Sequence, residues 1–223
     1  GVTCRVVSEP GATGEQEDRM EYGEFIESKR RDATFLGFDT DDISPVLFPY
    51  QRDVVKWAVK LGRAAIFQDC GMGKTLQQLE WARIILSKIG GSALILAPLA
   101  VSAQTAREAG KLNLSVNLCR TGDDVKPGIN ISNYEKLHHF SPDQFGAIVL
   151  DESSILKSFS GKVRQEIQQF ADSVYYRLAC TATPAPNDIM EIGTHSEFVG
   201  SMRRVEMLSE YFVHDGGDTQ KWR

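Results

Sequence analysis

The chain has 223 residues, of which 42% are hydrophobic and 25% charged, a composition typical of globular proteins with one sizeable core. No run of 18 or more apolar residues occurs, which argues against a membrane span, and the first 30 residues lack the apolar stretch of a signal peptide. The four cysteines lie far apart and the four histidines show no metal-ligand spacing, so we predict neither a disulfide framework nor a zinc site. We expect a protein of the reducing cytoplasm without membrane contact.

The charge is distributed unevenly along the chain. The formal net charge is −5, and residues 1–42 hold 11 acidic and 5 basic residues, whereas the remainder holds 19 and 20. We interpret residues 1–42 as an acidic, partly flexible N-terminal extension. Residues 17–31 within it could form a short helix or remain coil, and the sequence favours neither. The neutral main body does not exclude a nucleic-acid partner.

From residue 45 onward, segments with helical periodicity alternate with short apolar runs. Helices are predicted within 45–62, 75–91, 102–110 and 162–171. Strands are predicted at 64–67, 93–98, 128–135, 146–154 and 175–184. Nearly continuous apolar strands that alternate with helices indicate an α/β fold with a mostly parallel sheet and helices on both faces.

The first segment with chemical meaning is "GMGKT", residues 71–75, between a predicted strand and a predicted helix. Glycines allow the backbone to wrap an anion, and the helix N-terminus favours negative charge there. In a phosphate-binding loop, Lys74 would reach the phosphates and Thr75 would bind Mg²⁺. The strict loop pattern asks for a glycine at position 68, where this chain has Gln68.

Two further strand ends carry polar residues. "AIVLDESS" ends in adjacent acids, Asp151 and Glu152, which suits one carboxylate for Mg²⁺ and one group that orients or deprotonates water. "ACTATPAPND" places Thr181 and Thr183 at another strand end, where structural and functional readings are equally open. In parallel sheets, ligands bind at the carboxyl ends of the strands, where all these residues are expected.

Taken together, these segments resemble superfamily 2 helicases and translocases over about residues 45–200. "LFPYQRDVVKW" resembles the adenine-recognition segment of that superfamily, "ALILAPLAV" and "INISNYEKL" resemble motifs on its nucleic-acid side, and "DESS" stands where DEAD or DEAH stands. "QDCGMGKT", "DESSILKS" and "TPAPND" look most like Swi/Snf-type translocases and related bacterial and phage helicases. In this superfamily the first glycine of the strict loop is commonly absent, which accounts for Gln68.

The resemblance implies a RecA-like P-loop NTPase fold and assigns roles by position. The nucleotide-binding residues would be Gln51, Gly71, Met72, Gly73, Lys74 and Thr75. Thr75 and Asp151 would hold Mg²⁺, and the catalytic residues would be Glu152 as base and Lys74. Thr181 and Thr183 would couple the state of ATP to the grip on nucleic acid. Pro98, Leu99, Asn133 and Tyr134 would line the nucleic-acid track.

The resemblance also implies a domain plan and partners. Residues 43–200 would form the ATP-binding lobe, and residues 201–223 would begin a linker toward a second RecA-like lobe that carries the arginine finger. The implied cofactors are ATP and Mg²⁺, the partner is nucleic acid, by analogy double-stranded DNA, and the compartment is the cytoplasm of a bacterial or phage-infected cell. Two alternatives stay open, namely a different P-loop enzyme such as a small-molecule kinase or GTPase, and a lone lobe acting as a non-catalytic binding module.

Overall fold

A computed structural model describes residues 34–157, 161–185, 191–213 and 221–222. The chain divides into two compact units, residues 1–34 and 35–223, and the helix considered for 17–31 lies outside the described residues. The second unit includes residues 36–38, whose main-chain N–H groups donate to the carbonyls of residues 59–61. The predicted domain boundaries stay predictions.

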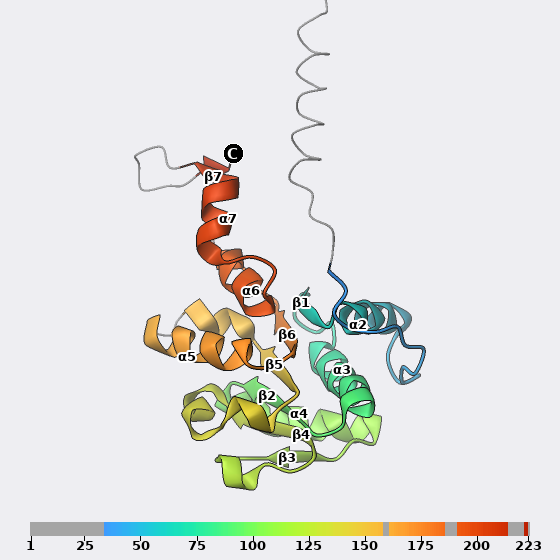
Figure 1. The fold of residues 1–223 in the computed structure, drawn as a ribbon. Coiled ribbons are helices and arrows are strands. Elements are labelled where there is room, and N and C mark those ends of the chain that lie inside the picture. Colours follow the sequence, from blue (N-terminus) through green and yellow to red (C-terminus); the bar gives the residue numbers. More distant parts are fainter. Residues whose placement is uncertain (1–33, 158–160, 186–190, 214–220, 223) are drawn as a thin grey trace, which may run out of the picture. The chain divides into compact units, whose positions relative to one another are not determined.

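Alternating helices and strands make up the second unit (Figure 1). The α-helices are α2 (Pro49–Leu61), α3 (Lys74–Ile89), α4 (Leu99–Ala109), α5 (Gly161–Asp172), α6 (Ile192–Val199) and α7 (Arg204–Tyr211). The strands are β1 (Arg63–Phe67), β2 (Ser92–Ala97), β3 (Val116–Leu118), β4 (Gly128–Asn133), β5 (Ala147–Asp151), β6 (Tyr176–Thr181), β7 (Phe212–Val213) and β8 (Lys221–Trp222). Short 3-10 helices are η1 (Gly110–Leu112), η2 (Gly122–Asp124), η3 (Tyr134–His139), η4 (Pro142–Gln144) and η5 (Ser153–Lys157).

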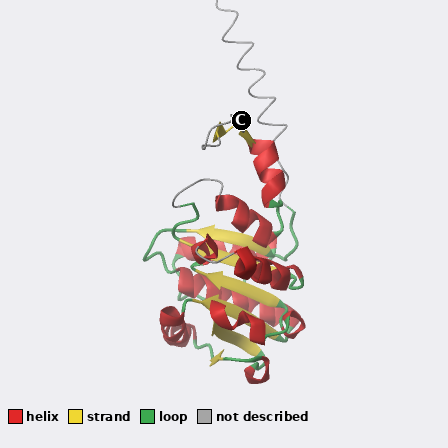
Figure 2. Cartoon of the chain, turned by 90° about the vertical axis from the view of Figure 1, so that its left-hand side faces the viewer, coloured by secondary structure: helices red, strands yellow, loops and turns green. Residues whose placement is uncertain are grey.

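Six strands form one sheet in the order β1-β6-β5-β2-β4-β3, as labelled in Figure 1, and every neighbouring pair is parallel; Figure 2 shows the strands in yellow. This confirms the predicted α/β class. Strands β7 and β8 pair separately and antiparallel. Because all six strands of the large sheet point the same way, their carboxyl ends meet at one edge, as the site prediction requires.

Alternate residues of the central strands enter two different cores. In β2, Ala93 and Ile95 pack into a core shared with α2, α3 and α4, whereas Leu94 and Leu96 pack into a core shared with η3, α5 and α6. Since side chains of a strand point alternately to its two faces, the sheet is covered by helices on both faces. No helix in the described part of the chain is long and apolar enough to cross a membrane.

Helix α2 starts and ends as its sequence dictates. Pro49 occupies its first turn, where a missing N–H costs nothing, and Gly62 ends it with φ of 73°, in the region that favours glycine. Residues 36–38 pack closely against the C-terminal end of α2: a Cβ added to Gly37 would lie 1.8 Å from the carbonyl oxygen of Val59. This close approach fixes the residues that precede α2 against its last turn.

Candidate nucleotide-binding site

The glycine loop lies between β1 and α3 and has the backbone geometry that a phosphate loop needs. Gly71 and Gly73 have φ of 79° and 73°, which side chains other than glycine rarely adopt. Gly73 directly precedes α3, so the loop leads into the N-terminus of a helix, where free main-chain N–H groups favour a bound anion. The predicted strand-loop-helix arrangement is therefore present around residues 71–75.

Lys74 is buried in this loop, with 8% of its surface exposed. Its ammonium Nζ donates hydrogen bonds to the main-chain oxygens of Gln68, at 3.0 Å, and of Asp69, at 3.1 Å. The two carbonyl groups thus hold the lysine across the base of its own loop. A bound phosphate would exchange these neutral acceptors for charged oxygens, which form stronger hydrogen bonds with an ammonium group.

Gln51, predicted to read adenine, is 3% exposed and uses both ends of its amide within the protein. Its Oε1 accepts from the main-chain N–H of Phe48 at 2.9 Å, and its Nε2 donates to the carbonyl of Met72 at 3.0 Å. The hydroxyl of Tyr50 donates to the same carbonyl at 2.9 Å. Gln51 therefore ties the start of α2 to the glycine loop, and its contact with adenine stays a prediction.

The two acids at the end of β5 differ in burial and conformation. Asp151 is 4% exposed, and burial raises the pKa of its carboxyl group above the usual value. Glu152 is partly exposed and has a left-handed backbone, with φ of 51°, stabilised by a hydrogen bond from the N–H of Ile155 to its carbonyl at 2.9 Å. These different environments suit the two separate roles that the sequence predicts for the pair.

A divalent cation fits the residues beside this pair. Asp151 and Thr75 line the same cavity and offer a carboxylate and a hydroxyl oxygen, which are ligands that Mg²⁺ accepts. Burial raises the pKa of Asp151, and a cation bound beside it would stabilise the charged form of its carboxyl group. The described residues include no group of three His, Cys, Asp or Glu side chains that could hold a metal, so this cation would depend on nucleotide and water oxygens.

One cavity of about 480 Å³ joins these features. Of the predicted residues it brings together Gln51, Gly71, Gly73, Lys74, Thr75, Asp151 and Glu152. Its other wall was not predicted: Gln104 of α4, together with Glu108 and Lys111, also lines it. Both carboxylate oxygens of Glu108 accept from Nζ of Lys111, at 2.8 and 2.7 Å. The amphipathic pattern of α4 gives no signal for this wall, because these residues resemble those of any solvated helix face.

The end of β6 contacts both the glycine loop and the acidic segment. The carbonyl of Thr181 accepts from the N–H of Gln68 at 3.2 Å, and its hydroxyl accepts from the N–H of Thr183 at 3.1 Å. The hydroxyl of Ser153 donates to the carbonyl of Cys180 at 3.3 Å. In this structure β6 is thus connected to the acidic segment through Ser153, and the coupling role of the two threonines stays a prediction.

The four residues predicted for the nucleic-acid track are in different environments. Leu99 is 72% exposed and Pro98 is half-buried, whereas Asn133 and Tyr134 are buried. The hydroxyl of Tyr134 donates to the main-chain carbonyl of Asp151 at 2.7 Å, which connects the end of β4 with the end of β5. Tyr134 therefore faces the interior beside the candidate metal site, and contact of these residues with nucleic acid stays a prediction.

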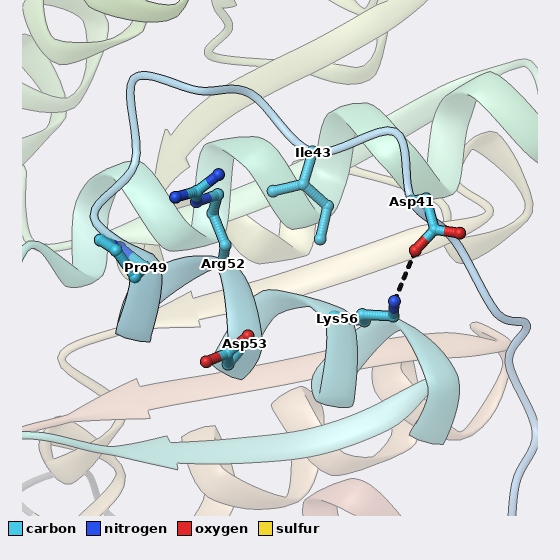
Figure 3. Close-up of a pocket in the computed structure, with 6 residues that line it drawn as sticks. All are labelled: Asp41, Ile43, Pro49, Arg52, Asp53 and Lys56. Carbon is cyan, nitrogen blue, oxygen red and sulfur yellow. Dashed lines mark hydrogen bonds and ion pairs between the residues drawn. The ribbon is translucent and has the colours of Figure 1, made fainter.

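A smaller cavity of about 200 Å³ lies between residues 41–43 and α2 (Figure 3). Arg52 and Asp53 line it, and Lys56 forms an ion pair with Asp41 at 2.5 Å across its rim. None of the glycine-loop residues lines it. We assign no site to this cavity.

Comparison with solved structures identifies the fold. The UvsW helicase of bacteriophage T4 is similar with a TM-score of 0.58 and 17% identity, over 83% of this chain and 66% of that chain. The Sulfolobus solfataricus SWI2/SNF2 ATPase core in complex with double-stranded DNA is similar with a TM-score of 0.61 and 20% identity, over 81% and 41%. The Pyrococcus furiosus Hef helicase domain is similar with a TM-score of 0.54 and 21% identity, over 68% and 36%.

No protein-family model matches the sequence, and no curated protein matches it significantly. This chain spans two thirds or less of the length of the three structures named above. At these identities the likeness establishes the fold, which is what the sequence motifs predict. The chain has a RecA-like α/β fold, which it shares with these helicase and ATPase structures.

Proposed function

We propose that the chain is the ATP-binding lobe of a nucleic-acid-dependent ATPase that couples ATP hydrolysis to movement on double-stranded DNA. The observation that carries the proposal is the cavity at the carboxyl edge of the sheet, which joins the glycine loop and Lys74 to Asp151 and Glu152. Phosphoryl transfer needs an anion cradle, a metal-holding carboxylate and a group that positions water, and this cavity offers one of each.

Each residue has a distinct task in this proposal. The main-chain N–H groups of residues 71–75 bind the phosphates, and Lys74 leaves the carbonyls of its own loop to bind them too. Thr75 and Asp151 hold Mg²⁺, which when bound neutralises phosphate charge. Glu152, more exposed than Asp151, takes a proton from the attacking water.

The support for DNA as the partner comes from one solved structure and from the surface at the start of α4. The SWI2/SNF2 ATPase core in the comparison was solved with double-stranded DNA, and this chain covers 41% of that structure. Leu99 and Pro98 offer exposed or half-exposed surface at the start of α4, where the sequence predicts the track. We propose that a second lobe completes the motor and supplies the arginine finger.

The test of nucleotide binding is a titration with a fluorescent ATP analogue. We expect the wild-type chain to bind it and Lys74→Ala to lose binding, because the ammonium group that meets the phosphates is gone. Lys162→Ala is the matched control, because Lys162 is exposed on α5 at the other face of the sheet. Unchanged affinity in Lys74→Ala contradicts the proposal, and a preference for GTP over ATP favours a different class of P-loop enzyme.

A second measurement addresses the proposed second lobe. Where it has been measured, an arginine finger contributes about 10³–10⁵ in rate, so residues 1–223 alone should hydrolyse ATP poorly. Phosphate release should stay near background with duplex DNA present. Fast, DNA-stimulated ATP hydrolysis by these residues alone would show that the lobe is catalytically complete, contrary to this part of the proposal.

A further inference from the structure

Gln78 on α3 contacts the candidate metal ligand, although no motif assigns it a role. Its amide Nε2 donates to Oδ1 of Asp151 at 2.6 Å, and the two residues are 73 positions apart in the chain. Gln78 is 0% exposed and Asp151 is 4% exposed, so water does not compete for this hydrogen bond. The contact joins the helix that follows the glycine loop to the strand that carries the acidic pair.

Asp151 is held at two points. Gln78 fixes its carboxylate, and the hydroxyl of Tyr134 fixes its main-chain carbonyl at 2.7 Å. A carboxylate held at both its backbone and its side chain loses little further freedom when it binds a cation. Partners that orient a metal ligand in this way affect metal affinity strongly in other proteins.

The environment of the Gln78 amide oxygen is unfavourable for stability. Its Oε1 is buried and has no hydrogen-bond partner among the described residues. A buried amide oxygen without a donor costs folding free energy, and an apolar side chain of the same size would avoid that cost. Natural proteins accept such costs at functional sites.

From these contacts we propose that Gln78 is a positioning residue that holds the Asp151 carboxylate in the orientation that receives the divalent cation of the bound nucleotide. The proposal rests on the proposed function, since it needs a nucleotide and its cation in the cavity. The competing explanation is a purely structural link between α3 and the sheet. A structural link would affect stability and all nucleotide binding, whereas a positioning residue affects the metal-dependent part of binding.

The experiment separates these two explanations in the full 223-residue chain. A fluorescent ATP analogue is titrated in EDTA, and Mg²⁺ is then titrated at fixed nucleotide to find the concentration that gives half of the affinity gain. Gln78→Leu removes the amide while keeping the volume roughly the same. We expect it to raise that Mg²⁺ concentration about 10- to 100-fold, with binding in EDTA unchanged. Direct Mn²⁺ binding, measured by electron paramagnetic resonance with nucleotide present, should weaken in parallel.

Two further variants keep the result interpretable. Gln78→Met replaces the amide with a more adaptable side chain and serves if Gln78→Leu does not fold. Thr105→Val is the matched control for a buried polar-to-apolar change, because Thr105 is fully buried in α4 and, among the described residues, its hydroxyl donates to the Val101 carbonyl of its own helix. It should leave both titrations unchanged.

The outcomes bear on different proposals. If the wild-type chain binds no nucleotide with or without metal, the proposed function fails, and the role of Gln78 fails with it. If the wild-type chain binds nucleotide but both Gln78 variants keep the wild-type Mg²⁺ dependence, the role of Gln78 alone is overturned. It is likewise overturned if the variants lose binding in EDTA and in Mg²⁺ by the same factor.

Discussion

Gln51 should stabilise the lobe even without nucleotide, because its amide connects α2 to the glycine loop. Gln51→Leu removes the hydrogen bonds to the Phe48 N–H and the Met72 carbonyl, each of which contributes about 1 kcal/mol net. The Met72 carbonyl keeps its hydrogen bonds from the Tyr50 hydroxyl and from Nε2 of Gln77, so this group adds no large desolvation cost. The expected loss is about 2 kcal/mol, or a fall in Tm of about 4–8 °C for a unit of this size.

The measurement is thermal unfolding followed by circular dichroism in EDTA without nucleotide. Gln104→Leu is the matched control, because this glutamine is exposed in the same cavity and its side chain makes no hydrogen bond to the described residues; its effect should stay within about 0.5 kcal/mol. Gln51→Glu should also lower Tm, since a carboxylate oxygen would face the Met72 carbonyl. If Gln51→Leu melts at the wild-type temperature, the amide does not hold the loop and the reasoning is wrong.

Three further predictions concern the same unit. Gly37→Ala should detach residues 36–38 from α2, since the new Cβ would lie 1.8 Å from the Val59 carbonyl oxygen, and hydrogen exchange of those amides should then become fast; persistent protection would contradict this. ATP with Mg²⁺ at 100 times its Kd should stabilise the chain by about 2.7 kcal/mol and thereby raise its Tm. Lys74→Ala should abolish this rise in Tm, and an equal rise in the variant would contradict the role of Lys74. Maleimide at pH 8 should label the exposed Cys70, and nucleotide should slow this reaction because Cys70 lines the cavity; an unchanged rate with nucleotide would count against the site. Cys119 should stay unlabelled, because burial raises the pKa of its thiol to about 11.

The sequence predicts the sheet and the loops at its carboxyl edge because both depend on local patterns. Short apolar runs, residues 93–97 and 147–150, become most of β2 and β5, and the glycines between β1 and α3 form the predicted loop. Strand β3 escapes prediction because it has three residues, none of them buried, and gains its place only by pairing with β4. Helices α6 and α7 escape it because each has eight residues and α6 begins with Ile192-Gly193, an unfavourable start.

Contacts within the site depend on which elements become neighbours in space, so local patterns do not reveal them. Gln78 stands in a helix whose apolar stripe predicts packing, yet its amide meets Asp151 because α3 crosses the sheet beside β5. Tyr134 follows a strand predicted to face nucleic acid, yet its hydroxyl turns inward to Asp151 because β4 and β5 both neighbour β2. In both cases the residue type is visible in the sequence and its partner is set by the order of the strands.

The backbone at Glu152 gives the acidic pair a feature that its sequence does not show. Among the described residues, Glu152 and Asn113 are the non-glycine positions with positive φ, and this conformation is costly for a side chain such as glutamate. The bond from Ile155 N–H to the Glu152 carbonyl and the bond from Ser153 to the Cys180 carbonyl hold the turn in place. Because β5 ends at Asp151, Glu152 lies just outside the strand, and its left-handed backbone turns the chain directly into η5. The Glu152 side chain therefore does not follow the alternating directions of the strand's side chains. A costly conformation at the residue expected to act as the base, held by hydrogen bonds from η5 and to β6, is a feature found at functional sites of other proteins.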